Sequence, residues 1–373
     1  MAEVLDWRRT AEPGHAAAHI ARSLAQGRLV AFPTETVYGI AASALVPDAV
    51  DYLVESKGRA SLKPLTLAIR GADDVADWLP GLGAAGRRLA RRCWPGPITL
   101  VSEEGVKEGL AARLPERVRQ RVCPNSTLGL RAPAHEAICQ VLRLLPGPLV
   151  LTSANRSGEP DATNADAVIE AVGDCVDLVI ADGPCRHGKP STVVEVKGDS
   201  WKILREGVMT AAMLERLTGC MIVFICTGNT CRSPMAEALF KKLLADRLGC
   251  QPDQLPAQGY TVRSAGLSAM SGIPAAPEAV EIAFELGADL SYHCSRPLTA
   301  ELVRQADFLV TMTHGHLLTL RDQFPRLDSC CRLLSADGDD VPDPIGADQA
   351  TYRACARQIM ACLEKLVPEV QPR

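Results

Sequence analysis

The residues whose types and spacing most clearly suggest a reaction lie between Cys226 and Ser233. An apolar run, MIVFIC, predicts a buried strand that ends at Cys226, and Arg232 follows in a C-x5-R spacing. The residues Arg232-Ser233-Pro234 are typical of a helix start. A strand, a short loop and a helix start are therefore expected around this cysteine. The loop residues are Thr227, Gly228, Asn229, Thr230 and Cys231.

This arrangement predicts a nucleophilic thiolate beside a bound phosphoryl group. Backbone N–H groups of the loop and the helix N-terminus bind an oxyanion, and Arg232 can contact two phosphoryl oxygens at once. The same field favours the thiolate form of Cys226, which can then form a cysteinyl-phosphate intermediate. A small cysteine in a buried core is the alternative, but it does not explain why glycine, asparagine, arginine and serine accompany it.

A displaced leaving group needs a proton, and Asp343 is the candidate donor. It precedes a proline in the segment GDDVPDPIGAD. An acidic surface turn is the alternative interpretation, because Asp-Pro pairs are common in turns. Spacing along the chain does not show that Asp343 reaches Cys226.

A second set of polar residues follows or opens apolar runs in the first half of the chain. Open α/β sheets bind ligands at the ends of their strands, so these residues are expected to converge on one cleft. Lysine and arginine there suit an anionic substrate such as a nucleoside triphosphate. Taken alone, the Lys57-Gly58-Arg59 triplet is also typical of a solvated helix end. The set comprises Thr34, Thr36, Lys57, Arg59, Lys63, Thr99, Arg131, Ser153, Asn155, Ser191 and Arg205.

The elements that must position these residues follow from apolar patterning. Strands are predicted at 29–32, 64–69, 98–101, 128–132, 148–152, 177–181, 192–196 and 201–205, with helices at 47–58 and 135–145. This alternation predicts an open α/β sheet. After residue 220, strands at 221–226, near YTVRSAG and at 307–313 alternate with helices and predict a smaller parallel α/β domain. The expected domains are 12–207 and 220–367, joined by a linker at 208–219.

Composition describes an ordinary folded protein and excludes several classes. Of the 373 residues, 47% are hydrophobic and 23% charged, which excludes a disordered chain. The net charge of -4 lacks the basic excess of a dedicated nucleic-acid binder. No apolar run approaches a membrane span and no signal-peptide core is visible, so a cytoplasmic protein without membrane contact is expected. The 14 cysteines are then expected to be reduced, and without paired C-x-x-C motifs no metal site is predicted.

Seven segments of the first domain occur in an order that resembles YrdC-type threonylcarbamoyl-adenylate synthases over about residues 12–207. They read VAFPTETVYGIAASA, ESKGRASLKPLTLAI, CWPGPITLV, LGLRAPAH, LTSANRSG, KPSTVVEV and ILREG. The resemblance implies that L-threonine, bicarbonate and ATP, assisted by Mg²⁺, give threonylcarbamoyl-AMP and pyrophosphate. A separate transferase would then modify tRNA, and a weak contact with double-stranded RNA is implied as well.

The same resemblance assigns the polar residues to two groups. Lys57, Arg59, Ser153, Asn155 and Arg205 would hold ATP. Nearer threonine would lie Thr34, Thr36, Arg131 and Ser191, with Lys63 and Thr99 in the same site. One departure is the segment Ala60-Ser61-Leu62 after Arg59, where relatives often carry a proline directly after the arginine.

The second domain resembles the low-molecular-weight protein-tyrosine-phosphatase family over about residues 221–365. The resemblance rests on CTGNTCRSPMAEALF, RSAG, RPLT, FLVTMT and the Asp-Pro pair. It implies Cys226 as nucleophile, Arg232 as phosphate clamp, Asp343 as general acid, and Asn229 with Ser233 as loop supports, without a cofactor. Cys231 could form a reversible disulfide with Cys226.

Two positions bear on the phosphatase substrate. Thr230 matches the loop of bacterial protein-arginine phosphatases, and Ile345 stands where tyrosine-directed relatives often have an aromatic ring. Both favour phosphoarginine in a phosphorylated protein, and phosphotyrosine is the alternative substrate.

The resulting hypothesis is a bifunctional enzyme. The alternatives are a nucleotide- or tRNA-binding module with an inactive phosphatase domain, and an arsenate reductase in which Cys231, or Cys330 and Cys331, relay electrons.

Overall fold

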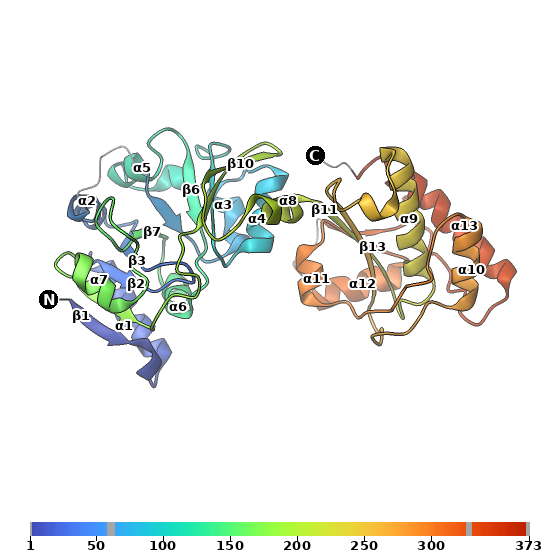
Figure 1. Cartoon of the computed structure of the whole chain (residues 1–373), viewed down its shortest axis with the longest axis horizontal. Coiled ribbons are helices and arrows are strands. Elements are labelled where there is room, and N and C mark those ends of the chain that lie inside the picture. Colours follow the sequence, from blue (N-terminus) through green and yellow to red (C-terminus); the bar gives the residue numbers. More distant parts are fainter. Residues whose placement is uncertain (1, 58–63, 326–329, 371–373) are drawn as a thin grey trace. The chain divides into compact units, whose positions relative to one another are not determined.

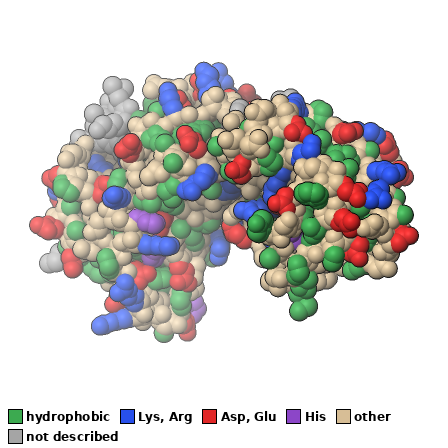
Figure 2. Space-filling view, turned by 45° about the vertical axis from the view of Figure 1, so that its right-hand side comes forward, with side chains coloured by type: hydrophobic (Ala, Val, Ile, Leu, Met, Phe, Trp, Pro, Cys, Tyr) green, Lys and Arg blue, Asp and Glu red, His purple; other side chains and the backbone are tan. Residues whose placement is uncertain are grey.

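The computed structural model describes residues 2–57, 64–325 and 330–370. The chain forms two compact units, Met1–Leu217 and Thr218–Arg373 (Figure 1). None of the helices in these residues is both long and apolar enough to cross a membrane. Figure 2 shows Lys and Arg side chains interspersed with Asp and Glu over the visible surface, so both signs of charge alternate there.

Within the described residues, unit 1 contains one ten-stranded sheet of mixed direction. The strand order is β1-β8-β2-β3-β7-β4-β6-β5-β9-β10, with β3 antiparallel to both of its neighbours. All eight predicted strands are present. The bounds are β1 (Glu3–Asp6), β2 (Val30–Phe32), β3 (Gly39–Ser43), β4 (Thr66–Ala68), β5 (Ile98–Ser102), β6 (Leu128–Arg131), β7 (Leu149–Ser153), β8 (Leu178–Ala181), β9 (Thr192–Lys197) and β10 (Ser200–Arg205).

Helices cover the two faces of this sheet unequally. On one face, α1 (Pro13–Ala25) and α6 (Glu136–Leu144) bury Ile20, Leu24 and Ile138 against β8, β2 and β7. The opposite face packs against α2 (Pro47–Ser56), α4 (Ala84–Cys93), α5 (Glu116–Val122) and α7 (Ala165–Val172). The remaining helices are α3 (Val75–Trp78) and α8 (Ala211–Thr218), with 3-10 turns at Trp7–Arg9, Ala72–Asp74 and Leu110–Arg113.

The strands from β7 to β9 have one core-facing side and one side that lines a cavity. Successive side chains of a strand point to opposite faces of the sheet. Leu67, Leu130, Leu100 and Val194 accordingly belong to the core, whereas their neighbours Thr66, Gly129, Thr99 and Val193 line the cavity. One face of the sheet is therefore covered by α1 and α6 at β8, β2 and β7. The same face lines the cavity from β7 to β9.

The segment expected to link the domains is folded onto unit 1. Met209 is buried, and its backbone exchanges hydrogen bonds with the Thr192 hydroxyl at 2.8 and 2.9 Å. Leu214 of α8 is fully buried in the core of the same unit.

Within the described residues, unit 2 has a four-stranded parallel sheet of order β12-β11-β13-β14. The strands are β11 (Cys220–Cys226), β12 (Tyr260–Gly266), β13 (Phe308–Thr311) and β14 (Cys331–Leu333). The helices are α9 (Arg232–Leu248), α10 (Pro277–Glu285), α11 (Ala300–Gln305), α12 (His314–Gln323) and α13 (Gln349–Leu366), with a 3-10 turn at Pro252–Gln254.

Alternation along β11 places the cysteine at its end. Ile222, Phe224 and Cys226 belong to the core formed with α9, α10 and α13. Val223 and Ile225 face the second core, beneath α11 and α12. Helices therefore pack on both faces of a parallel sheet, and the predicted α/β fold class of both halves is confirmed.

Candidate functional sites

The loop after β11 curls around the thiol of Cys226. The backbone N–H of Asn229 lies 3.3 Å from Cys226 Sγ, and the Ser233 hydroxyl lies 2.9 Å from the same sulfur. Asn229 adopts a φ of 56°, in the left-handed region that asparagine tolerates better than most residues. This turn directs the loop back toward the cysteine. The structure therefore brings Cys226, Asn229 and Ser233 together.

Buried hydrogen bonds fix Asn229 from several elements. Its side-chain N–H groups donate to the hydroxyls of Ser233 at 3.0 Å and Ser264 at 2.9 Å, and its Oδ1 accepts the backbone N–H of Arg296 at 2.9 Å. His293 Nε2 lies 2.8 Å from the Asn229 carbonyl oxygen. A fully satisfied buried network holds the loop in one conformation. Ser264 and His293 were not predicted as supports.

A glycine of β12 allows the loop to lie close to the sheet. A Cβ atom at Gly266 would lie 2.4 Å from the Thr227 carbonyl oxygen, closer than two such atoms can approach. Only glycine therefore fits at the end of the RSAG segment.

Arg232 and Asp343 meet beside this loop, although 111 residues separate them. Arg232 Nη2 pairs with the Asp343 carboxylate, and Nη1 donates to the Val341 carbonyl at 3.2 Å. Arg232 Nε is buried and has no hydrogen-bond partner in the described part of the chain. A buried donor without a partner calls for an explanation, and an oxyanion bound in the loop would supply one.

His316 contacts the first residue of the loop and was missing from the predicted site. Its Nε2 lies 2.9 Å from the Thr227 hydroxyl, and its Nδ1 lies 3.0 Å from the hydroxyl of Thr313, the N-cap of α12. Burial, and then the charge of Arg232, lower the pKa of His316. A neutral imidazole suits two hydroxyls, because each hydroxyl can donate or accept.

We expect acidification to destabilise the contact between α12 and the loop. The folded pKa of His316 lies below its unfolded value of about 6.5, so the folded state binds fewer protons and stability falls as pH decreases through 6.5. Protection factors of peptides from α12 and the loop, which are exchange rates corrected for the intrinsic pH dependence of amide exchange, should therefore fall between pH 7.5 and 5.5. In His316→Asn, this acid-dependent loss of protection should largely disappear. An unchanged pH dependence in the variant would refute the assignment.

Cys331 and Cys231, two of the thiols considered as an electron relay, lie at different distances from Cys226. Cys331 lies on β14, two strands away from β11. It pairs with Leu309 of β13, which in turn pairs with Val223, three residues before Cys226 on β11. These offsets correspond to about 10 Å along the strands and about 10 Å across them. Cys231 is closer, but it is buried against the Tyr352 hydroxyl at 3.3 Å, and burial raises the pKa of its thiol.

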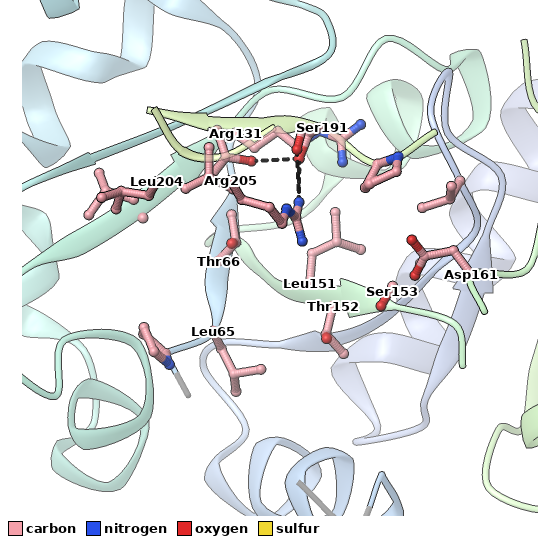
Figure 3. A pocket seen from close by; sticks show the side chains of 18 of the residues that line it. Leu65, Thr66, Arg131, Leu151, Thr152, Ser153, Asp161, Ser191, Leu204 and Arg205 are labelled. Atoms are coloured by element: carbon pink, nitrogen blue, oxygen red, sulfur yellow. Dashed lines mark hydrogen bonds between the residues drawn. The ribbon is translucent and has the colours of Figure 1, made fainter. Parts of the chain in front are cut away.

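In unit 1, the predicted polar residues line a cavity of about 550 Å³ (Figure 3). It lies over the face of β7, β4, β6, β5 and β9, and most of the predicted residues in its lining stand at or next to the ends of strands. Strand-end clefts arise where parallel strands end together, whereas this sheet has mixed directions. Small residues such as Gly129 and Thr66 leave room above the strands. The predicted residues in its lining are Thr34, Lys57, Thr99, Arg131, Ser153, Asn155, Ser191 and Arg205.

Thr36 is the one predicted residue within the described part of the chain that is not in this lining. Thr36 lies next to it, with its hydroxyl 2.7 Å from Arg131 Nη2 and 2.8 Å from the Thr34 hydroxyl. Arg59 and Lys63, together with the Ala60-Ser61-Leu62 departure, lie outside the described residues.

Lys57 connects the end of α2 to the end of β7. The helix ends at Ser56, and Lys57 Nζ donates to the Ser153 carbonyl at 2.5 Å and to Asn155 Oδ1 at 3.1 Å. The Ser153 hydroxyl donates to the same Asn155 oxygen at 2.6 Å. A buried ammonium thus stands beside a hydroxyl and an amide at the cavity wall.

A buried ion pair holds Arg131. Its Nη2 lies 2.7 Å from Glu35 Oε1, and Glu35 Oε2 accepts the backbone N–H of Ala134 at 2.8 Å. Arg131 Nε is buried and has no hydrogen-bond partner among the described residues. Sequence reasoning missed the contact of Glu35 with Arg131, although Glu35 stands between two predicted threonines.

Arg205 reaches into the cavity from β10 (Figure 3). Its Nη2 donates to the Ser191 carbonyl at 2.8 Å and lies 3.3 Å from the Ser191 hydroxyl. That hydroxyl lies 3.0 Å from Thr99 Oγ1 on the neighbouring strand. The cavity therefore combines three fixed cations with hydroxyl and amide groups, a set suited to phosphates and carboxylates.

Two family models match the chain in succession. The model described as Telomere recombination, named for Sua5, YciO and YrdC, matches residues 22–207. The model described as Low molecular weight phosphotyrosine protein phosphatase matches residues 221–373.

Individual proteins give the same division. A threonylcarbamoyl-AMP synthase of Pyrococcus abyssi is 35% identical over 52% of this chain and 54% of its own length. The protein-arginine-phosphatase of Bacillus subtilis is 40% identical over 40% of this chain and 96% of its own length. A solved structure of doubly substituted Sua5 from P. abyssi covers 89% of this chain and 98% of that chain, with 22% identity and a TM-score of 0.53. The last comparison shows likeness of fold alone. The chain spans about half the length of the first synthase relatives that it matches.

Proposed function

Because the chain belongs to the Sua5/YciO/YrdC family in its first unit and to the low molecular weight phosphatase family in its second, we propose that it is a bifunctional enzyme. Unit 1 would make threonylcarbamoyl-AMP from L-threonine, bicarbonate and ATP. The observation that carries this proposal is the cavity in which Lys57, Arg131 and Arg205 are held among hydroxyl groups. We further propose a cytoplasmic location, where ATP and tRNA meet, delivery of the product to a separate tRNA threonylcarbamoyl transferase, and a weak contact with RNA.

The residues of the cavity divide by chemistry. Lys57, Ser153 and Arg205, with Asn155 and the undescribed Arg59, would hold the triphosphate. Arg131 would direct its unpartnered Nε to the threonine carboxylate, beside Thr34, Thr36 and Ser191. The threonine nitrogen forms a bond to the bicarbonate carbon with loss of water, which gives a carbamate. A carbamate oxygen then forms a bond to the α-phosphorus, and the bond from that phosphorus to the pyrophosphate oxygen breaks. Fixed cations stabilise the charge that develops on pyrophosphate.

Mg²⁺ fits the donors that this cavity offers. Hard divalent cations prefer oxygen ligands, and the lining holds the Asp161 carboxylate near hydroxyl groups. When bound with ATP, the ion would neutralise charge on the triphosphate.

Pyrophosphate release tests the synthase proposal. We expect the full chain to release pyrophosphate from ATP only when both threonine and bicarbonate are present. Release that is independent of threonine would indicate simple ATP hydrolysis and would contradict the proposal.

Unit 2 would hydrolyse phosphorylated proteins, and no cofactor is proposed for it. The carrying observation is Cys226 within the loop, together with the unpartnered Nε of Arg232 and the adjacent Asp343. Cys226 Sγ forms a bond to phosphorus as the bond to the leaving group breaks, and Asp343 gives the leaving group a proton. Water then cleaves the sulfur–phosphorus bond and restores the thiolate. A merely binding domain would not need this complete set.

We propose phosphoarginine as the substrate class, because a small, partly polar wall suits a guanidinium group. Thr230 is half-buried in the loop, with its carbonyl bound to the Ala276 N–H at 3.0 Å. The similarity to a protein named protein-arginine-phosphatase supports this choice. Ile345, which is 66% exposed, supplies no aromatic ring for stacking on phosphotyrosine.

Thr230→Ile is expected to change substrate preference. An apolar side chain would leave guanidinium N–H groups unpaired at a cost of about 1–3 kcal/mol each. We expect kcat/KM on a phosphoarginine protein to fall by roughly one to two orders of magnitude, with kcat/KM on a phosphotyrosine peptide kept or raised. Hydrolysis of nitrophenyl phosphate serves as the control for an intact loop. A wild type that prefers phosphotyrosine, with an unchanged ratio in the variant, would eliminate the arginine proposal.

A further inference from the structure

One carboxylate in the unit 1 cavity is assigned neither to the triphosphate nor to threonine in the reaction outlined above. Figure 3 shows Asp161 in the wall near Ser153, with its carboxylate turned toward the cavity. The other acidic residue of the lining, Glu195, pairs with Lys202 at 2.6 Å. Within the described residues, the Asp161 carboxylate has neither a hydrogen-bond nor a salt-bridge partner. An acidic group is thus available in a cavity otherwise suited to anions.

Such a carboxylate would repel a triphosphate unless a cation lay between them. Two like charges a few ångströms apart repel each other more strongly in a partly buried cavity than in water. Asp161 and Arg205 both line the cavity, but no salt bridge joins them, and Arg205 Nη2 donates to the Ser191 carbonyl. Partial burial lowers the pKa of Arg205, and the charge of Asp161 opposes this shift.

The substrates of the proposed synthase bring two cations, the ammonium of threonine and the metal ion that accompanies ATP. Asp161 lies near Ser153 and Arg205, which are assigned to the triphosphate. Protein-bound Mg²⁺ usually has one or two carboxylate ligands, with substrate phosphates and water completing its shell. The described residues contain no cluster of three or more metal-binding side chains, so a metal here would depend on such shared coordination.

We propose that Asp161 is a protein ligand of the Mg²⁺ that enters with ATP, with triphosphate oxygens and water as the other ligands. This inference rests on the proposed function of unit 1. It assigns the acidic residue of the cavity to the metal rather than to threonine.

Nucleotide affinity with and without Mg²⁺ tests the proposal. Asp161→Asn is expected to keep or raise the affinity for metal-free nucleotide and to lower the gain in affinity that Mg²⁺ brings. In the wild-type full chain, Mg²⁺ should tighten binding of a non-hydrolysable ATP analogue by about tenfold or more. In Asp161→Asn, metal-free analogue should bind equally well or more tightly, since a repulsive charge is gone. The gain from Mg²⁺ should fall below about threefold.

Glu159→Gln is the matched control. Glu159 lies two residues before Asp161 in the sequence, and its side chain is exposed and outside the cavity lining. The substitution removes one negative charge, as Asp161→Asn does, and should retain the full Mg²⁺ effect. With Mn²⁺ in place of Mg²⁺, paramagnetic resonance of the analogue complex should show one protein ligand replaced by water in Asp161→Asn alone.

Three results would overturn the proposal. An Asp161→Asn variant that keeps the full Mg²⁺ gain and loses threonine affinity would assign this carboxylate to the ammonium. Loss of metal-free analogue binding would indicate a structural residue. A wild-type chain that binds no ATP analogue would refute the proposed function itself, whereas either of the first two results would leave it standing.

Discussion

Cys226→Ser is expected to abolish phosphatase turnover, with a loss on the order of 10⁴-fold or more. The sulfur lies within the turn of the loop, 3.3 Å from the Asn229 N–H and 2.9 Å from the Ser233 hydroxyl. A serine hydroxyl there would remain un-ionised and would be a poor nucleophile. Phosphate release from a phosphoarginine protein measures the loss.

The same variant should still bind inorganic phosphate, because Arg232 and the loop N–H groups are unchanged. Asp343→Asn is the comparison that isolates proton donation. It should slow hydrolysis of substrates with poor leaving groups by about 10²–10⁴-fold, and that of a nitrophenyl phosphate much less. Equal losses on both substrates would show that Asp343 is not the acid, and turnover retained in Cys226→Ser would remove the nucleophile.

Lys57→Met should reduce threonine- and bicarbonate-dependent pyrophosphate release by about 10²–10³-fold. Its ammonium is buried at the cavity wall and lies 3.1 Å from Asn155 Oδ1. Methionine keeps much of the side-chain volume but brings no charge to the triphosphate. A coupled pyrophosphate assay at saturating threonine and bicarbonate measures the effect.

Lys197→Met supplies the matched control, because that lysine is 76% exposed and pairs with Glu103 on the surface. It should release pyrophosphate at the wild-type rate, and both variants should retain full phosphatase activity. Lys57→Arg should recover part of the lost rate, since a guanidinium keeps the charge in a different geometry. Normal release by Lys57→Met would exclude the proposed triphosphate site.

The features that the sequence predicted most accurately are those that depend on residues adjacent in the chain. Cys226, its loop and Arg232 follow one another along a strand, a turn and a helix, so the apolar run before the loop and the helix-start residues after it anticipated their arrangement. The approach of Asp343 depends on chain segments 111 residues apart, and only resemblance to a family suggested it. For the same reason His293 and His316 escaped prediction, because each reaches the loop from a distant segment.

Unit 1 shows a different limit. The eight predicted strands are present, but β3 escaped prediction because GIAAS contains one β-branched residue among small ones. Strand direction and order are set by long-range pairing, so the sequence could not place the cavity on the face of the sheet. Glu35 was missed because a buried ion pair gives no local pattern.

The alternation along β4, β6 and β5 has a consequence for how this enzyme can change. Residues 66, 129 and 99 shape the substrate space, whereas residues 67, 130 and 100 belong to the core on the opposite face. Substitutions at the first set alter the room and polarity available to a substrate without removing buried apolar contacts. Specificity can therefore drift, in nature or in a mutant library, at little thermodynamic cost to the fold.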